Sequence, residues 1–331
     1  MKTFHVQWHI TNTCNLRCKH CYHDSYRVSD DLRFPQIQVL FDGLVKFLKK
    51  NKYHLTVDIT GGEPFFHPDF WQIIQMLENC NHVMQCGIIT NGTVLTEKIL
   101  NQLAGFSKIK VVKISCEGSD KQSFEKIRPF PYEKFLKILE LVSMFKFEKL
   151  LMFTLLETNS DQISGLFNLV TRFNLDGFIM ERFFPMGAGK KLNNFFVTNE
   201  TWQSTVKQLL TSCGMPDDLM LVAEYRGFKV LRKKNRWELF GAPCIVGKYG
   251  CAIMHDGNVF PCRRFVLSIG NALIEPFEKI WMKNPCRTMR RKNLKGNCGV
   301  CSIKKCYGCR ALAHCIYGDC FAEDPLCFLN V

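Results

Sequence analysis

The sequence lacks any apolar run that approaches the ~20 residues a membrane-spanning helix needs. Its first residues, MKTFHVQWHITNTC, also lack the continuous apolar segment of a secretory signal. With 331 residues, 47% of them hydrophobic, the chain can still bury one large core or two medium ones. These features predict a soluble, cytoplasmic protein with no membrane partner.

Acidic residues are scarce relative to basic ones: 30 Asp and Glu stand against 44 Lys and Arg, a formal net charge of +14. A basic surface can attract nucleic acid, an anionic membrane or an acidic peptide. The basic residues are spread along the chain, however, with only local groups at 232–236 and 289–295. A solvated basic surface is therefore favoured, and a nucleic-acid partner is not expected.

Cysteine, by contrast, is abundant, with 18 in the chain. Cytoplasmic thiols stay reduced, so metal ligation explains this number better than disulfides do. The cysteines also cluster: three lie within 14–21 and eleven within 244–327. The remaining four are interpreted as buried, inert small hydrophobic residues: Cys80, Cys86, Cys116 and Cys213.

Apolar segments that end in polar loops alternate with helical patterns in the first part of the chain. Such alternation predicts an α/β fold, because parallel strands need crossover helices. Six units up to about residue 210 favour a partial (β/α)6 TIM-type barrel over a full one, with chemistry at the carboxyl ends of the strands. The predicted domains are a barrel over 1–210, a bridging region over 211–243 and a cysteine-rich domain over 244–331.

The first cysteine group has the spacing C-x3-C-x2-C, formed by Cys14, Cys18 and Cys21. Three thiolates on one loop can hold three irons of a four-iron cluster and leave the fourth iron open for chemistry. Half of a zinc site is the alternative, with His20 or His23 as a fourth ligand.

Polar motifs follow the next predicted strands: GGEP at 61–64, TNG at 90–92 and SCEG at 115–118. Two adjacent glycines allow a ligand to approach the backbone closely, and the Glu63 carboxylate could accept an amino acid's ammonium group. Each motif alone is an ordinary turn. Together they place polar groups around one barrel mouth, which argues against the zinc alternative.

The cysteine spacing followed by a GGEP-type motif resembles the radical SAM superfamily over about residues 4–190. The resemblance implies a [4Fe-4S] cluster with S-adenosyl-L-methionine (SAM), which is cleaved reductively to a 5′-deoxyadenosyl radical. It also implies that Cys14, Cys18 and Cys21 are the metal ligands and that methionine chelates the fourth iron. The cofactor-binding residues it implies are His20 beside adenine, Gly61, Gly62 and Glu63 at the methionine amino group, and Ser115 and Arg128 near the ribose and carboxylate. Cys116-Glu117 departs from the commoner Leu-Asp, and Asn159 is either a polar residue near the cofactor or an ordinary turn residue.

The C-terminal region carries the second cysteine group. Asp256-Gly257 predicts a hairpin that would bring Cys251 close to Cys262, with Cys244 nearby. Further on, a tight run is closed by Cys327: Cys298, Cys301, Cys306 and Cys309. A zinc ribbon is the alternative, but it uses only part of this set, whereas eight cysteines suffice for two four-iron clusters.

This region, with its GN-x3-EPFEKIW and GCRA segments, resembles the SPASM domain, an auxiliary-cluster extension of radical SAM enzymes. The resemblance implies two auxiliary [4Fe-4S] clusters. The one nearer the barrel would be bound by Cys244, Cys251, Cys262 and Cys309, and the outer one by Cys298, Cys301, Cys306 and Cys327. Three cysteines are surplus: Cys286, Cys315 and Cys320. Cys315 and Cys320 could substitute for a neighbouring ligand; the surplus cysteines could equally be spare thiols, or one could be a hydrogen donor.

Three functions are compatible with these features. The favoured hypothesis is a maturase that abstracts hydrogen from a ribosomally synthesised precursor peptide and installs a thioether, a carbon–carbon link or an epimerised residue. The alternative is an enzyme of haem, tetrapyrrole or other redox-cofactor biosynthesis. A non-catalytic iron–sulfur or zinc scaffold is disfavoured by GGEP and by the open three-cysteine site.

The expected partners follow from the favoured hypothesis. Flavodoxin or ferredoxin is expected as the electron donor, because cluster potentials can lie below about −400 mV. The first strand begins almost at Met1, so a leader peptide would be recognised by a separate binding protein or by this chain's surface. No catalytic base can be named; Glu117, Glu181 and Arg182 lie at predicted strand ends.

Overall fold

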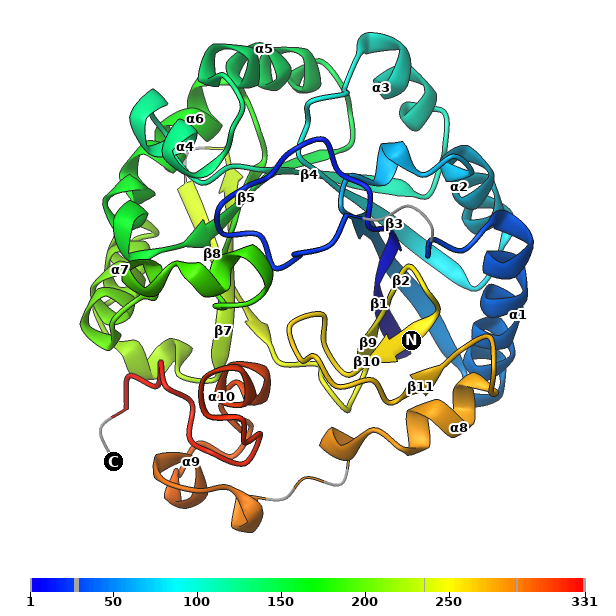
Figure 1. The fold of residues 1–331 in the computed structure, drawn as a ribbon. Helices are drawn as coiled ribbons and strands as arrows, with labels where there is room; N and C mark the ends of the chain where they lie inside the picture. The colour runs from blue at the N-terminus through cyan, green and yellow to red at the C-terminus, as the bar shows by residue number, and fades with distance from the viewer. Residues whose placement is uncertain (1, 27–29, 235, 288, 290, 330–331) are drawn as a thin grey trace.

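Six parallel strands form the centre of the protein in a computed structural model, which describes residues 2–26, 30–234, 236–287, 289 and 291–329. They are β1 (Lys2–Thr11), β2 (Tyr53–Gly61), β3 (Val83–Thr90), β4 (Ile109–Ser115), β5 (Glu148–Leu155) and β6 (Gly177–Arg182). Each pairs in parallel with the next. The predicted partial barrel is thereby confirmed, and Figure 1 views it along its axis.

Helices cover the outside of these strands (Figure 1). They are α1 (Phe34–Asn51), α2 (Phe70–Asn79), α3 (Glu97–Ala104), α4 (Lys121–Ile127), α5 (Tyr132–Ser143), α6 (Ile163–Arg172) and α7 (Asn199–Ser212). Each of the longer ones buries an apolar stripe, such as Ile37, Leu40, Phe41 and Leu44 of α1. Polar side chains accept from N-terminal amides at two of these helices: Thr96 caps α3 and Asp120 caps α4.

The predicted bridging region, residues 211–243, contributes two strands to the same sheet. β7 (Tyr225–Lys233) runs antiparallel to β6, and β8 (Arg236–Pro243) pairs antiparallel with β7. At the opposite edge, β9 (Gly250–Ile253) pairs in parallel with β1. The described residues therefore form one 11-stranded sheet in the order β11-β10-β9-β1-β2-β3-β4-β5-β6-β7-β8.

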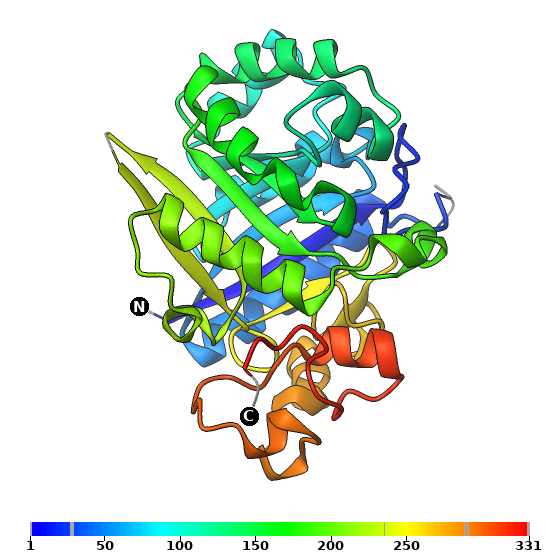
Figure 2. The same ribbon diagram turned by 90° about the vertical axis from the view of Figure 1, so that its left-hand side faces the viewer.

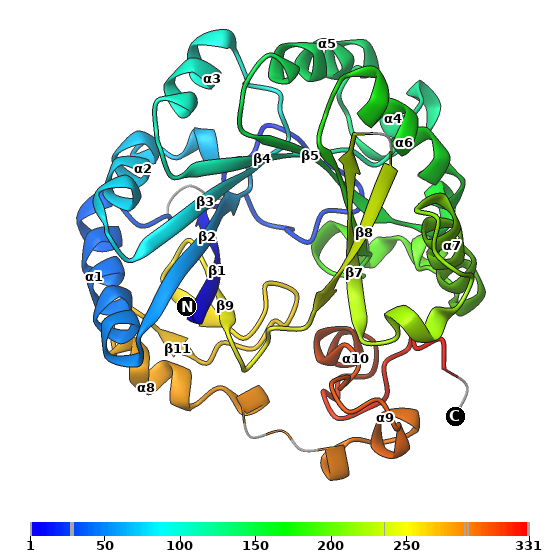
Figure 3. The ribbon, with the colours of Figure 1, turned by 180° about the vertical axis from the view of Figure 1, so that it is seen from behind.

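The cysteine-rich region contains the predicted hairpin and short helices. β9 pairs antiparallel with β10 (Asn258–Phe260), and Gly257 takes a positive φ of 84° in the turn. Then come β11 (Gly270–Asn271), α8 (Phe277–Met282), α9 (Asn297–Val300) and α10 (Arg310–Tyr317). Figures 2 and 3 show this region along one side of the barrel, with α8 near α1 and α10 near β7.

Aromatic packing fixes α8 against the barrel. The ring centroid of Phe4 on β1 lies 4.9 Å from that of Trp281, and Phe47 of α1 lies 5.1 Å from Phe277. Such pairs add about 0.5–1.5 kcal/mol beyond area burial. None of the helices in the described part of the chain is both long enough and apolar enough to span a bilayer.

Candidate functional site

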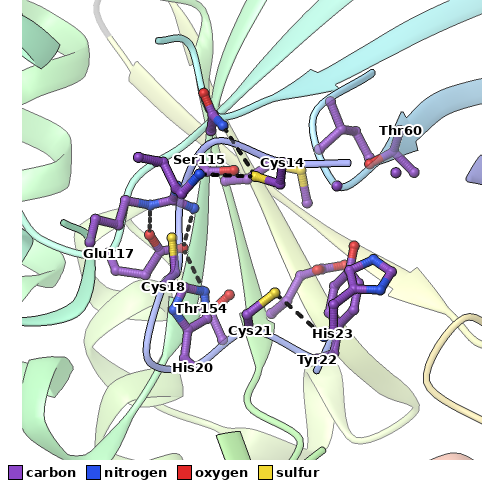
Figure 4. Close-up of a pocket in the computed structure, with 18 of the residues that line it drawn as sticks. Cys14, Cys18, His20, Cys21, Tyr22, His23, Thr60, Ser115, Glu117 and Thr154 are labelled. Atoms are coloured by element: carbon purple, nitrogen blue, oxygen red, sulfur yellow. Dashed lines mark hydrogen bonds and ion pairs between the residues drawn. The ribbon is translucent and has the colours of Figure 1, made fainter. Parts of the chain in front are cut away.

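A cavity opens at the carboxyl ends of the parallel strands, and the loop after β1 lies across it. The three cysteines of this loop, Cys14, Cys18 and Cys21, all line the cavity. Figure 4 shows their thiols facing a common space, with His20 and Glu117 beside Cys18. Five of the seven predicted cofactor-binding residues also line it: His20, Gly61, Gly62, Ser115 and Arg128.

Glycines bring the GGEP loop against the cysteine loop. The Gly62 amide donates to the Thr11 carbonyl and the Glu63 amide to the Thr13 carbonyl, each at 2.7 Å. A Cβ atom at Gly62 would overlap the carbonyl oxygen of Thr13. The sequence predicted that a ligand would approach the backbone of these glycines. At Gly62 the cysteine loop itself makes this close approach, and the contact fixes the position of the loop that carries the thiols.

Glu63 is buried and is not among the residues that line the cavity. Its carboxylate oxygens accept from the Thr90 hydroxyl and the Asn91 amide, each at 2.7 Å. Burial, partly offset by these bonds, raises the pKa of Glu63 to about 7. The carboxylate therefore joins the GGEP loop to the TNG loop, and its direct contact with methionine stays a prediction.

Hydrogen bonds reach two of the cysteine sulfurs. Asn91 Nδ2 donates to Cys14 Sγ at 3.7 Å and the Leu16 amide at 3.5 Å, while the His23 amide donates to Cys21 Sγ at 3.4 Å. Such donors favour the thiolate form that binds iron. Burial raises the pKa of Cys18 to about 12 although Arg128 opposes it, so metal binding is what would stabilise its thiolate.

A buried ion pair and a histidine lie beside Cys18. His20 Nε2 lies 3.3 Å from a Glu117 oxygen, and Arg128 forms an ion pair with the same carboxylate. Burial alone would raise the pKa of Glu117, but Arg128 and His20 outweigh burial and lower it to about 2. His20 is thereby oriented at the cavity wall, as an adenine neighbour would require. Both histidines of the zinc alternative have another polar partner: His20 has Glu117, and His23 Nε2 lies 3.4 Å from Arg263.

Asn159 does not line the cavity. Its amide nitrogen donates to the carbonyls of Glu117 at 3.0 Å and Thr154 at 3.1 Å, and its oxygen accepts from the Leu156 amide at 2.8 Å. These contacts fit the turn interpretation of Asn159. Cofactor contact by its side chain stays a prediction.

Several cavity residues have no local signal in the sequence. Arg264 comes from the cysteine-rich region and pairs with Glu181 at the end of β6. Arg263 lies 3.5 Å over the ring of Tyr22, next to Cys21. The Arg264–Glu181 contact joins residues 83 positions apart, and Arg263 lies 240 positions from His23, so only the folded chain reveals these contacts. Arg182 is structural: it binds Asp324 at 3.0 and 2.9 Å and the Leu326 carbonyl at 2.9 Å.

Three of the C-terminal cysteines line a second cavity: Cys244, Cys286 and Cys306. Sulfurs of the predicted outer ligands receive hydrogen bonds: Cys298 Sγ accepts from Arg310 and from the Asp324 amide, each at 3.3 Å. Arg226 and the Gly308 amide donate to Cys306 Sγ, the amide at 3.4 Å. All 18 cysteines are free thiols. The donor set and its cationic neighbours fit thiolate-bound iron–sulfur clusters.

Comparison with known families agrees with this geometry. Residues 8–170 match the model of the radical SAM superfamily, and residues 244–309 match that of the SPASM iron-sulfur cluster-binding domain. The chain is therefore a radical SAM enzyme with a C-terminal SPASM domain. Its cofactors are SAM with a [4Fe-4S] cluster in the barrel and auxiliary iron–sulfur clusters in the SPASM domain.

Among radical SAM enzymes, several curated proteins are similar to this chain over nearly its whole length. The AdoMet-dependent heme synthase of Methanosarcina barkeri is 26% identical over 97% of this chain and 95% of its own length. That of Nitratidesulfovibrio vulgaris is 24% identical over 97% and 91%, and the pre-heme d1 synthase of Dinoroseobacter shibae is 24% identical over 98% and 86%. These relatives contradict the favoured peptide-modifying hypothesis. It was wrong because the motifs that identify the enzyme bind cofactors and clusters, and do not report on the substrate.

Solved structures share the fold. Streptococcus suis SuiB bound to the precursor peptide SuiA superposes with a TM-score of 0.73 at 15% identity, covering 99% of this chain and 76% of SuiB. The structure of anSMEcpe with bound AdoMet gives 0.71 at 17% identity, covering 98% and 94%. At these identities the likeness concerns the fold alone, so the peptide bound to SuiB says nothing of this chain's substrate.

Proposed function

We propose that this radical SAM enzyme acts in haem or related tetrapyrrole biosynthesis. One observation carries the proposal: relatives matched over 97–98% of the chain are named heme synthase, pre-heme d1 synthase and Fe-coproporphyrin III synthase. The products in these names differ, but all are tetrapyrroles. The proposed substrate is accordingly a tetrapyrrole that carries carboxylate side chains.

The residues around the first cavity would divide the work as follows. Cys14, Cys18 and Cys21 would hold three irons, and the cavity wall at His20 and Ser115 would border the adenosyl part of SAM. Together these cofactors supply a carbon radical that removes a hydrogen atom from the substrate. The buried Glu117–Arg128 pair would keep His20 in place without adding net charge to the site.

Arg264 is the cavity cation best suited to a substrate carboxylate. Its side chain is 26% exposed and its partner Glu181 is 27% exposed. Arg128 and Arg182, which also line the cavity, are only 7% and 1% exposed and are held by buried carboxylates. Opening a partly exposed ion pair costs little, whereas breaking a buried one costs several kcal/mol. Arg264 can therefore exchange Glu181 for a carboxylate of the tetrapyrrole.

The proposal includes an electron donor and a compartment. Flavodoxin or ferredoxin would reduce the cluster, as the low potentials of such clusters require. A cytoplasmic location suits 18 free thiols, because that compartment keeps them reduced. The separate leader-binding protein belongs to the peptide interpretation and forms no part of this proposal.

The test compares two substrates with the anaerobically reconstituted enzyme, SAM and reduced flavodoxin. We expect iron coproporphyrin III to raise 5′-deoxyadenosine formation at least about tenfold, about 1.4 kcal/mol of barrier. The porphyrin should change mass in parallel, as read by mass spectrometry. Stimulation by a short peptide and by none of the tetrapyrroles tried would overturn the proposal.

A variant tests the carboxylate contact. Arg264→Met should raise the KM for the porphyrin about tenfold and leave SAM cleavage without substrate unchanged. Arg264→Lys should lose less, because it keeps the charge but not the forked geometry. Arg172→Met removes an exposed arginine on α6 and serves as the matched control.

A further inference from the structure

The segment from residue 279 to residue 318 carries charge of one sign. Ten of its side chains are Lys or Arg, and none is Asp or Glu. The basic group at 289–295, which the sequence alone assigns to a solvated surface, lies within it. Neither SAM cleavage nor the proposed substrate uses this charge. The same segment contains three predicted ligands of the outer auxiliary cluster: Cys298, Cys301 and Cys306.

Buried arginines and exposed lysines divide this charge between them. Arg310 donates to Cys298 Sγ at 3.3 Å, and Arg226 donates to Cys306 Sγ, so these arginines serve the thiols. A set of exposed lysines instead forms no hydrogen bond or ion pair with any described residue. They are Lys292, Lys304 and Lys305. Their charges face solvent and are available to a partner molecule.

Arg291 ties together the segments that carry these lysines. Its guanidinium donates to the carbonyl of Cys298 at 3.3 Å and to that of Cys306 at 2.8 Å. Lys292 follows Arg291 in the short turn Arg291–Asn293, and Lys304 lies two residues before Cys306. The exposed charges therefore lie beside predicted cluster ligands. Figures 1 and 3 show α9, which carries Cys298, at the outer edge of the molecule.

An exposed apolar side chain accompanies these charges. Val300 ends α9, directly precedes Cys301 and is 72% exposed. Protein interfaces combine apolar contacts with a polar rim. A nucleic-acid backbone, by contrast, offers phosphates to the lysines but no apolar group to cover Val300. The composition of this surface thus favours a protein partner with acidic residues around an apolar contact.

We propose that the SPASM basic face, formed by Lys292, Val300, Lys304 and Lys305, docks an acidic one-electron carrier protein. Electron transfer falls steeply with distance, so a carrier must dock close to a cluster, and this face lies beside the outer one. Opposite charges speed the encounter and orient the two proteins. The inference rests on the electron donor of the proposed function and is independent of the tetrapyrrole substrate.

The experiment compares two reductants in SAM cleavage without substrate. In the reconstituted double variant Lys292→Glu with Lys304→Glu, the KM for reduced flavodoxin should rise at least about tenfold at low salt. The difference from the unmodified enzyme should shrink as salt is added, because salt screens exposed charges. With dithionite and methyl viologen, which need no docking surface, the rate should be unchanged. Equal losses with both reductants would overturn the proposal.

A matched pair separates local charge from net charge. Lys134→Glu with Lys137→Glu reverses two exposed lysines of α5, which lies across the molecule from α9 in Figure 1. This variant should keep the KM of the unmodified enzyme for flavodoxin. An equal rise in both double variants would overturn the proposal, because net charge alone would then explain it.

Cross-linking of the unmodified, reconstituted enzyme avoids any effect of a variant on folding. A carbodiimide joins lysine amines to carboxylates of oxidised flavodoxin, and mass spectrometry locates the links. We expect links at Lys292, Lys304 and Lys305. Links at Lys19 alone, which is exposed next to Cys18, would overturn the proposal and place the carrier at the barrel cluster.

Two further outcomes have distinct meanings. If single-stranded RNA bound the unmodified enzyme but not the Lys292→Glu, Lys304→Glu variant, and the KM for flavodoxin were unchanged, the face would be a nucleic-acid site and the proposal would be overturned. If the reductant comparison gave the expected result while no tetrapyrrole stimulated SAM cleavage, the docking surface would stand and only the proposed substrate would fail.

Discussion

Glu117 keeps a negative charge inside the barrel because Arg128 forms an ion pair with it and His20 lies beside it. Its side chain is 2% exposed, between His20 and Arg128. An isolated carboxylate at such a place would take up a proton, but the low pKa of Glu117 shows that the ion pair overcomes burial. The charges of Glu117 and Arg128 compensate each other, so removal of either leaves the other buried and unpaired.

Glu117→Gln should therefore be costly. We expect the free energy of unfolding to fall by about 3–5 kcal/mol, because a glutamine cannot balance Arg128. SAM cleavage should fall because a neutral glutamine holds His20 more weakly than the carboxylate does. Denaturant unfolding and 5′-deoxyadenosine assays measure the two effects. The exposed pair Lys121–Glu133, at 2.9 Å, supplies the control: Glu133→Gln should cost less than about 1 kcal/mol. Equal losses in both variants would contradict the role given to Glu117.

Glu63 makes stability depend on pH in the opposite sense to a paired carboxylate. Its pKa rises from the ordinary 4.5 to about 7 on folding, because it is buried. Between these values the folded carboxyl keeps a proton that the unfolded one has lost. The free energy of unfolding should then decrease as the pH rises through this window, by on the order of 3 kcal/mol.

Urea unfolding of the reconstituted protein between about pH 5.5 and about pH 7.5 measures that slope. Glu63→Gln removes the titrating group and should flatten the curve, while the exposed Glu200→Gln on α7 should keep it. A slope that persists in Glu63→Gln would assign the dependence to another group.

At the scale of elements, strands β1 to β6 could be predicted because each is an apolar run ending in a polar loop. The β9–β10 hairpin was equally predictable from Asp256-Gly257. The pairing of β9 with β1 was not, because it joins positions about 240 residues apart and leaves no local pattern. In the site, too, local motifs could be predicted and long-range contacts could not. The motif residues on strand ends could be named from the sequence. Arg264, which lines the cavity, and Arg263, which lies over the Tyr22 ring of the cavity wall, come from the cysteine-rich region and leave no local pattern.

Helix α8 carries much of the attachment between the two cysteine-bearing regions. Phe277 is 2% exposed and packs against Phe4 and Phe47. Phe277→Ala should lower the free energy of unfolding by about 3–5 kcal/mol through lost burial and a residual cavity. Met282 lies at the end of the same helix and is 63% exposed, so Met282→Ala should change the free energy of unfolding by less than about 0.5 kcal/mol. Thermal and urea unfolding distinguish the two variants, and similar midpoints would mean that α8 does not anchor the region.

Over the whole molecule, the SPASM region closes the open side of the barrel and adds charge to the first cavity. Arg182 on β6 is bound to Asp324, and Asp324 also pairs with Arg226 and accepts from the Cys309 amide at 2.9 Å. One buried carboxylate therefore connects the barrel with a predicted auxiliary ligand. The two regions are held together by ion pairs as well as by the shared sheet.

Arg263 extends this connection to the cluster site. It is 6% exposed and forms no ion pair with a carboxylate of the described residues; its guanidinium instead lies over Tyr22, next to Cys21. A buried, uncompensated cation is unfavourable alone, but it stabilises added negative charge nearby. Reduction would add one electron to the cluster of which Cys21 is a predicted ligand. Arg263 should therefore favour the reduced cluster.

Arg263→Met keeps the length of the side chain and removes its charge, so the barrel cluster should become harder to reduce. EPR-monitored redox titration measures the midpoint potential, and the signal that changes on addition of SAM identifies this cluster among the three. We expect a more negative midpoint in Arg263→Met, a value near that of the unmodified enzyme in Arg263→Lys, and unchanged auxiliary signals farthest from Cys21. An unshifted potential in Arg263→Met would mean that Tyr22 and solvent already screen the guanidinium, and that the SPASM region acts on the barrel through packing alone.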